Sequence, residues 1–244
     1  VIGTTILAAG QYNAVTTILG HDINNVNAGG NPQTVMTNMN VQVPCTLNAP
    51  TANTLAFTAV QGGGNPTPQT ESFGATGNCA WPVRWNVSSS QPTWLNVSPA
   101  SGSFTAAGQT VSVTVAPASS TLPPGTYTTQ IALSYIDSTS TQVAGSPQTI
   151  PVTFTITGFT ISGTVNACAD TSCTTPAPLA SAAVTMTDGS GAHLTTTADA
   201  NGNYTFTGVA LGAGTISASG SDTTKSYTGT ASLNVTGDQG NVSV

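Results

Sequence analysis

The chain has 244 residues, and only Arg84 and Lys225 are basic, against eight acids and a formal net charge of −6. Ordinary globular chains are about a quarter charged, whereas this one is 4% charged and 38% hydrophobic. Without basic clusters the chain cannot neutralise phosphates, which excludes nucleic acid as a partner. No run approaches the ~20 apolar residues of a membrane-spanning helix, so no membrane-spanning segment is expected.

Thr is the commonest residue and Val is frequent, while Glu, Lys and Arg occur once each. This bias favours strands over helices. The chain begins at Val1 rather than Met, with no charged segment before an apolar core, and we interpret it as a processed product. Together these features predict an all-β extracellular protein.

The sequence of residues 1–48 predicts an N-terminal arm rather than a compact domain. A helix would place Val15, Ile18 and Leu19 on one face, but the Thr pairs and Gly10 favour extended chain. A linker-like loop over 24–34 and a second strand over 35–44 follow. The apolar residues of the first segment have no domain of their own, and they are the candidates for a strand shared with another subunit: Val1, Ile2, Ile6, Leu7, Val15, Ile18 and Leu19.

Four cysteines form two plausible pairs, Cys45 with Cys79 and Cys168 with Cys173. An even count in a secreted-looking chain favours disulfides. Zinc is the alternative, but the spacing of the second pair is wide for a zinc knuckle and no His lies near it in sequence.

Residues 49–157 alternate with the period of half-buried strands. Apolar residues recur at every second position within 125–135, 109–115 and 148–156, and turn signals separate these runs. Trp85 and Trp94 are expected in the core. Trp81 is the candidate carbohydrate contact, although core burial is the alternative there as well.

The order of motifs in this region resembles the BACON-type immunoglobulin-like module. The residues that carry the resemblance are Trp94, Leu95, Val97, Pro99, Ser101, Gly102, Leu122, Gly125, Thr126, Tyr127 and the strand after Pro147. The resemblance implies a β-sandwich of secreted, multi-modular surface proteins, for which carbohydrate or mucin binding has been suggested.

Residues 158–244 are similar to carboxypeptidase regulatory-like, or CnaB-like, prealbumin-type domains. The similarity rests on Gly163, the segment 182–186, Asp199, Asn201, Gly202, Tyr204 and Phe206. In CnaB-type pilin domains a first-strand Lys bonds covalently to a late Asn with the help of an acid. Here the first strand has no Lys and the region has no Glu, so we expect no such isopeptide. The predicted architecture is two tandem immunoglobulin-like β-sandwiches with an extended arm.

The titratable residues give little basis for catalysis. Asp199, Asn201 and Asn203 resemble the start of a calcium loop, but a hairpin turn uses the same residues. His21 and His193 lie beside no Cys or paired acid. Most acids fall in predicted turns, with Glu71 and Asp137 near loops of the first sandwich. We expect no enzyme, no metal and no cofactor.

Five Asn-x-Ser/Thr triplets are candidate glycosylation sites. They begin at Asn86, Asn96, Asn203, Asn234 and Asn241. In a chain this rich in Asn, Ser and Thr, several such triplets arise by chance.

An apolar arm outside a sandwich needs burial, and adding a strand to a neighbour's sheet provides it. Head-to-tail contact of that kind builds filaments, although the arm can instead fold back on its own chain. We therefore predict a structural subunit of an extracellular, pilus-like cell-surface filament, a homopolymer of identical subunits. The alternatives are a carbohydrate-binding or stalk module of a surface adhesin that contacts surface glycans, or an accessory domain of a secreted hydrolase.

Overall fold

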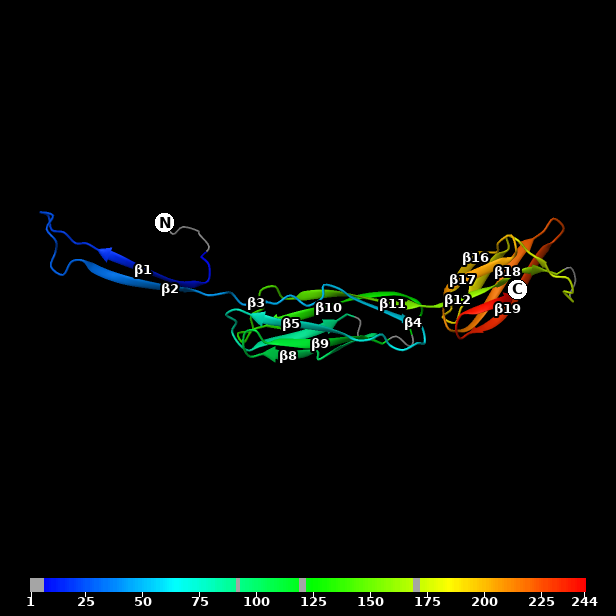
Figure 1. Ribbon diagram of the computed structural model, residues 1–244, viewed down its shortest axis with the longest axis horizontal. Coiled ribbons are helices and arrows are strands. Elements are labelled where there is room, and N and C mark those ends of the chain that lie inside the picture. Colours follow the sequence, from blue (N-terminus) through cyan, green and yellow to red (C-terminus); the bar gives the residue numbers. More distant parts are fainter. Residues whose placement is uncertain (1–6, 91–92, 119–121, 169–171) are drawn as a thin grey trace.

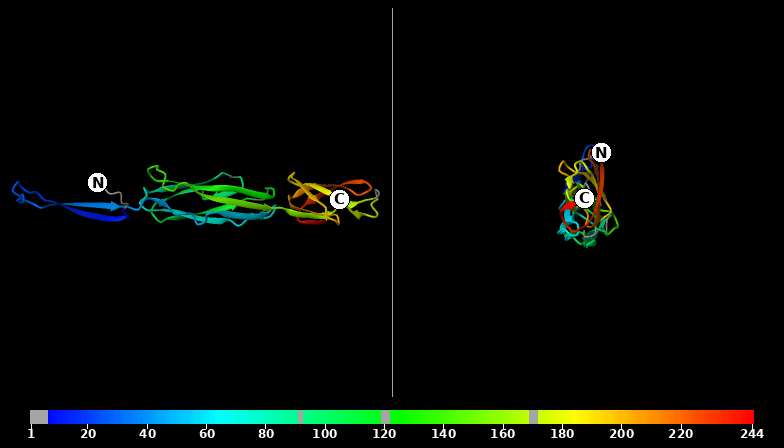
Figure 2. Two further views of the ribbon diagram at one scale, coloured as in Figure 1. Left: turned by 90° about the horizontal axis from the view of Figure 1, so that it is seen from above. Right: turned by 90° about the vertical axis from the view of Figure 1, so that its right-hand side faces the viewer.

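The computed structural model describes residues 7–90, 93–118, 122–168 and 172–244, which form strands, turns and loops without a helix. The predicted all-β class is confirmed. Figures 1 and 2 show three parts in succession along the long axis: an N-terminal ribbon, a first sandwich and a second sandwich. Within the described part, no helix is present that could cross a membrane.

The ribbon consists of two antiparallel strands, β1 (Gly10–Ile18) and β2 (Gln33–Val41). Their register runs without interruption from the pair Gly10↔Val41 to the pair Ile18↔Gln33. In Figure 1 the ribbon points away from both sandwiches, and the loop that joins its strands lies at the far end of the molecule.

The first sandwich packs a five-stranded sheet against a four-stranded sheet. In spatial order, the five-stranded sheet contains β4 (Leu55–Val60), β11 (Gln148–Thr157), β10 (Gly125–Ile136), β6 (Val83–Ser89) and β8 (Ser101–Phe104). The other sheet contains β3 (Thr46–Leu47), β5 (Gln69–Thr76), β9 (Thr110–Pro117) and β7 (Leu95–Ser98).

Alternating side chains of these strands meet in one core, as their period of two predicts. Phe73 of β5 lies at its centre, with its ring 5.3 Å from that of Trp85 and 6.0 Å from that of Tyr135, both edge to face. Trp94 is buried as well. The expected core positions of Trp85 and Trp94 are thus observed.

The second sandwich has its own core, separate from the first. One sheet contains β17 (Asn203–Val209), β12 (Phe159–Thr164) and β20 (Gln239–Ser243). The other contains β16 (His193–Thr197), β15 (Ala183–Thr187), β18 (Gly212–Ser221) and β19 (Ser226–Val235). A small pair, β13 (Asn166–Ala167) and β14 (Ala177–Pro178), lies beside them.

A single residue, Gly158, separates the last strand of the first sandwich from the first strand of the second. A Cβ atom at this position would lie 2.6 Å from the carbonyl oxygen of Val209 and 2.7 Å from Cγ of Pro124. The side chain of Gln61 crosses the same junction and accepts a hydrogen bond of 2.7 Å from the N–H of Leu211. The two sandwiches are therefore in direct contact at a tightly packed junction.

Candidate functional site

The strongest candidate for a functional surface is the ribbon, because it presents apolar side chains outside both cores. β-branched and aromatic residues favour its extended conformation. An isolated two-stranded hairpin is at best marginally stable in water, and further strands or a packing partner are normally required. A two-stranded ribbon of this kind therefore gains stability from a packing partner or an additional strand.

The loop at the tip of the ribbon is held by side-chain hydrogen bonds rather than by a two-residue turn. Asp22 Oδ1 accepts hydrogen bonds from the N–H groups of Asn24 and Val26. The amide of Asn31 closes the base of the loop, because it donates to the carbonyl of Gly20 and accepts from the N–H of Gly20. These contacts fix the register of the two strands from the loop end.

The two faces of the ribbon differ in character, because residues paired across an antiparallel ladder lie on the same face. The face that we name the apolar face carries Tyr12, Ala14, Ile18, Val35, Met39 and Val41, together with Gly10, Thr16, Gln33 and Thr37. The opposite, polar face carries Gln11, Asn13, Thr17, Thr34, Asn38 and Asn40, together with the facing pair Val15 and Met36. Such a ribbon is amphipathic in the manner of a strand pair at the edge of a sandwich.

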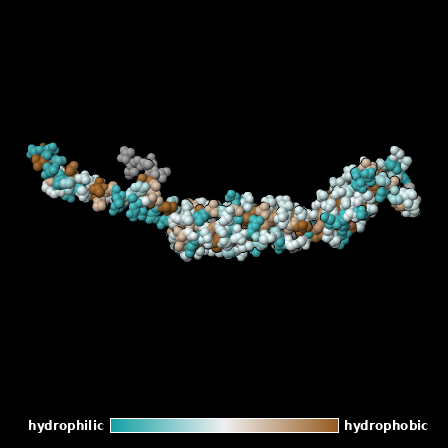
Figure 3. Space-filling view, in the orientation of Figure 1, coloured by the Kyte–Doolittle hydropathy of each residue, from teal (hydrophilic) through white to brown (hydrophobic). Residues whose placement is uncertain are grey.

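The apolar face is open to solvent. Ile18 is 54% exposed, Val35 50% and Met39 46%. Apolar side chains are also exposed at the tip, where Ile23 and Val26 lie. Figure 3 shows the corresponding brown areas along the ribbon and at its end. Tyr12 and Val41 of the same face are half-buried, and the hydroxyl of Tyr12 donates a hydrogen bond to the carbonyl of Ala8.

Of the predicted inter-subunit residues, Leu7, Val15, Ile18 and Leu19 are exposed, whereas Val1, Ile2 and Ile6 lie outside the described residues. The segment from Gly10 to Ile18 is a strand, as expected. The sequence did not reveal that this strand pairs with β2 of the same arm, so the arm is a ribbon rather than a single free strand. The 14-residue loop between the strands carries no short hairpin signal that would have predicted the pairing.

Both predicted cysteine pairs are disulfides. Cys45 bonds to Cys79 and Cys168 bonds to Cys173. Cys45 follows β2 by four residues and packs against the first core, so the first disulfide anchors the base of the ribbon to the sandwich. Disulfides are consistent with an extracellular location.

The other candidate residues are dispersed. Trp81 is half-buried and packs against the first core. His21 lies in the tip loop of the ribbon and His193 on the exposed strand β16. The five candidate glycosylation residues are all exposed. Within the described ranges, no three His, Cys, Asp or Glu side chains gather at one place.

Glu71, which the sequence placed near a loop of the first sandwich, is the third residue of β5 and is buried. Its carboxylate accepts hydrogen bonds of 2.8 Å from the hydroxyl of Thr51 and 2.9 Å from the N–H of Ala52. The carboxylate of Glu71 therefore links β5 to the segment before β4. The regular alternation of side chains along β5 directs this carboxylate inward.

Two aspartates of the second sandwich hold turns. Asp199 accepts from the N–H groups of Asn201 and Asn203 and from the side chain of Asn203. The side-chain hydrogen bond from Asn203 is the main cause that lowers the pKa of Asp199. Because both carboxylate oxygens are engaged within the turn, the geometry favours the hairpin interpretation of this motif.

Asp188 is the more deeply buried of these two aspartates. Burial by itself raises the pKa of this carboxyl, but hydrogen bonds from Ala210, Ser190 and Ala192 outweigh it, and the pKa of Asp188 lies below its usual value. The N–H of Ala210 donates to the Asp188 carboxylate over 3.0 Å and so joins two loops. These loops lie at the end of the sandwich that adjoins Gly158, because Val209 pairs with Phe159.

Comparisons with solved structures give distant likenesses. A C. elegans member of the MSP family, WR4, has a TM-score of 0.31 at 21% identity, over 45% of this chain and 96% of that one. BcpA, the major pilin subunit of Bacillus cereus, has a TM-score of 0.33 at 10% identity, over 96% of this chain and 77% of that one. The Bacillus anthracis TIE protein has a TM-score of 0.38 at 9% identity, over 82% and 40%. Nothing about binding or assembly follows from likenesses at this level.

No curated protein matches the sequence. One family profile does, and its match coincides with the first sandwich, where the sequence motifs resemble the same family. The segment of residues 51–155 matches the family described as "Viral BACON domain".

Proposed function

We propose that the chain is a structural subunit of an extracellular, cell-surface filament, in which the ribbon of one copy docks on the next copy. The observation that carries this proposal is the apolar face of the ribbon, which projects from the sandwiches and exposes Ile18, Val35 and Met39 to solvent. Apolar patches of this kind mark interaction surfaces. Docking would cover the face and provide the additional strands that a hairpin lacks.

The ribbon lies at one end of an elongated chain (Figure 2), so we expect the filament to grow along the long axis of the molecule. A contact between the end of one copy and a different surface of the next is heterologous, and such contacts produce open polymers unless the rotation closes a ring. The docking unit in this proposal is a two-stranded ribbon. It replaces the single exchanged strand that the sequence suggested.

The charge of the molecule supports self-association. β1 and β2 contain no charged residue, and the whole chain is 4% charged. Burying such surfaces removes few ions from water, so the desolvation cost that accompanies buried ion pairs is small. The scarcity of Lys and Arg also leaves few sites for trypsin-like proteases on an exposed polymer.

The sandwiches serve in this proposal as non-catalytic spacers. We assign the second one to the CnaB-like, prealbumin-type class, on the support of its three-stranded sheet facing a four-stranded one and of the sequence motifs at its turns. The disulfides support function outside the cell, since such bonds persist in oxidising environments.

The test replaces two residues of the apolar face in the double variant Val35→Asn, Met39→Asn. The matched control, Asn38→Ser, Asn40→Ser, changes the same strand on the polar face. Sedimentation of the purified full chain is measured over a range of concentrations. The wild type and the control are expected to form sedimenting polymers, and the apolar-face variant is expected to remain monomeric. Polymers of the apolar-face variant at wild-type yield would refute the role of the ribbon.

A further inference from the structure

The surface that accepts the ribbon is identifiable if the filament proposal holds, and the argument rests on that proposal. The outer edge of β19 in the second sandwich is a long strand edge without a neighbour. Among the described strands, β19 forms a ladder only with β18, over ten residue pairs. An unpaired edge of this length presents a row of backbone donors and acceptors to another strand.

The backbone groups that point outward from β19 can be assigned. The carbonyl of Asn234 accepts a hydrogen bond from the side chain of Gln239, outside the β18 ladder. Backbone groups alternate between inward and outward along an antiparallel strand. The N–H and C=O groups of Thr228, Thr230 and Ser232 therefore face outward, away from β18.

The other edges of the two sandwiches are shorter or less regular. β3, β7 and β8 have only two to four residues, and β16 has five. Both β17 and β20 have an irregular register with β12. The edge strand β4 is capped in part by Gln69, whose side chain donates to the carbonyl of Ala56. β19 contains no Pro, no charged residue and no irregularity in its ladder, and the cap that Gln239 supplies lies at Asn234, next to the last residue of the strand.

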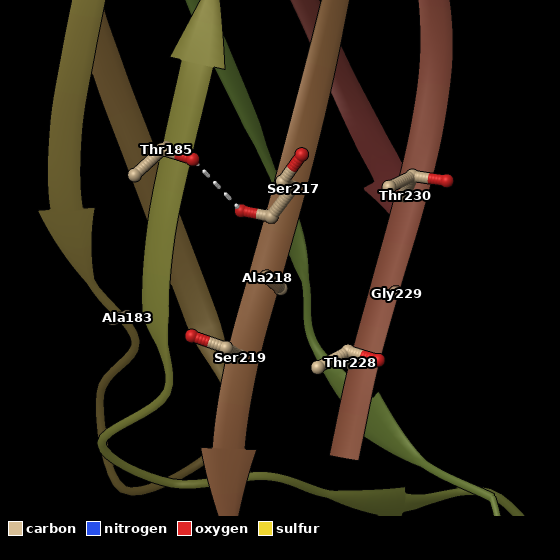
Figure 4. Close-up of a pocket in the computed structure, with 8 residues that line it drawn as sticks. All are labelled: Ala183, Thr185, Ser217, Ala218, Ser219, Thr228, Gly229 and Thr230. Atoms are coloured by element: carbon tan, nitrogen blue, oxygen red, sulfur yellow. Dashed lines mark hydrogen bonds between the residues drawn. The ribbon is translucent and has the colours of Figure 1, made fainter.

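The surroundings of β19 match both faces of the ribbon. The solvent side of its sheet is a shallow depression of small and hydroxylated residues, which include Thr185, Ser217, Ser219, Thr228 and Thr230 (Figure 4). On the other side, the seam between the two sheets opens beside β19 and is lined by apolar residues, which include Val165, Leu179, Tyr227 and Val244. A ribbon added to this edge would continue the hydroxylated surface with its polar face and cover the seam with its apolar face.

The lengths and charges of the ribbon strands also fit those of β19. β1 and β2 have nine residues each and β19 has ten. All three strands are free of charge. The charged residues nearest in sequence to β19 are Lys225, in the turn that precedes it, and Asp238, in the segment that follows it. The second sandwich and the ribbon lie at opposite ends of the molecule (Figure 1).

We propose that the β1–β2 ribbon of one copy adds to the outer edge of β19 in a second copy, so that the second sandwich gains two strands. Each molecule then donates a ribbon at one end and accepts a ribbon at the other. The contact repeats without closing, because donor and acceptor surfaces differ.

The first variant, Thr230→Pro, removes an outward N–H and places a ring where the incoming strand would lie, while the ladder with β18 keeps its hydrogen bonds. The matched control is Thr195→Pro on β16, the opposite edge strand of the same sheet. Circular dichroism and thermal unfolding verify that both variants fold. Thr230→Lys, a charge at the same edge, serves as the second variant should the Pro variant unfold.

The sedimenting fraction of the Thr230 variant is expected to fall at least tenfold, while the Thr195 control polymerises like the wild type. Mixing the Thr230 variant, which keeps its ribbon, with the Val35→Asn, Met39→Asn variant, which keeps its β19 edge, should yield one-to-one heterodimers by light scattering.

Normal polymers of the folded Thr230→Pro and Thr230→Lys variants, with the ribbon variant monomeric, would overturn the β19 acceptor and leave the filament proposal intact. Polymers of the ribbon variant at wild-type yield, or a wild type that stays monomeric at every concentration, would overturn both.

Discussion

The disulfide between Cys45 and Cys79 closes a loop with a sequence separation of 34 at the base of the ribbon. In the chain-entropy description, opening a loop of this length costs about 4 kcal/mol of stability at 25 °C. The bond between Cys168 and Cys173 closes a separation of only 5, for which the same relation gives about 2 kcal/mol. The double variant Cys45→Ala, Cys79→Ala should therefore destabilise its sandwich about twice as much as Cys168→Ala, Cys173→Ala destabilises the other.

Differential scanning calorimetry of the full chain provides the assay, because the two sandwiches have separate cores and can unfold in separate transitions. At roughly 4 °C per kcal/mol for a domain of this size, the Cys45 and Cys79 variant should lower the transition of the first sandwich by about 15 °C. Hydrogen exchange during heating identifies which sandwich unfolds first. A shift below about 3 °C, or a shift confined to the second sandwich, would refute the loop-entropy reasoning.

Two further predictions concern the second sandwich and the junction. Asp188→Asn should cost about 1–3 kcal/mol at neutral pH, because the Ala210 N–H loses its charged acceptor. Because the pKa of Asp188 is lowered in the folded state, its contribution to the free energy of unfolding is present above the unfolded pKa of about 4 and fades as the pH falls below it. The stability that the variant loses, measured by chemical denaturation, should therefore be smaller at pH 3 than at neutral pH. An equal loss at both pH values would contradict this. Gly158→Ala should cost roughly 1–3 kcal/mol, because its methyl group meets the backbone of Val209. Gly237→Ala, with open space around it, is the control, and equal melting temperatures for both variants would contradict the close packing of the junction.

Alternation along single strands was the most informative signal in the sequence. It predicted the inward faces of β10 and β11, because any half-buried strand must show the local two-residue period. The extended conformation of the N-terminal segment was expected instead from its Thr pairs and Gly10.

The pairing of the strands was harder to predict from the sequence, because it depends on contacts between residues that are distant in sequence. The ribbon forms through a long loop closed by Asp22 and Asn31, and neither residue signals a hairpin by itself. Glu71 was expected near a loop, and its burial was not foreseen, because the hydrogen bonds that permit it come from Thr51 and Ala52, about twenty positions earlier.

The acceptor edge was not recognised at all. Its ten residues, SYTGTASLNV, alternate like those of any other strand. Whether a strand lies at the edge of a sheet follows from the topology, which the sequence of one strand does not contain. The lack of Pro and charge within this segment was the available clue.

Electron cryomicroscopy of the wild-type full chain at increasing concentration tests the central claim most directly. The account predicts unbranched filaments in which the density of the β1–β2 ribbon lies beside β19 of the adjacent copy. Separate rods at every concentration, or filaments in which the ribbon projects freely into solvent, would contradict it.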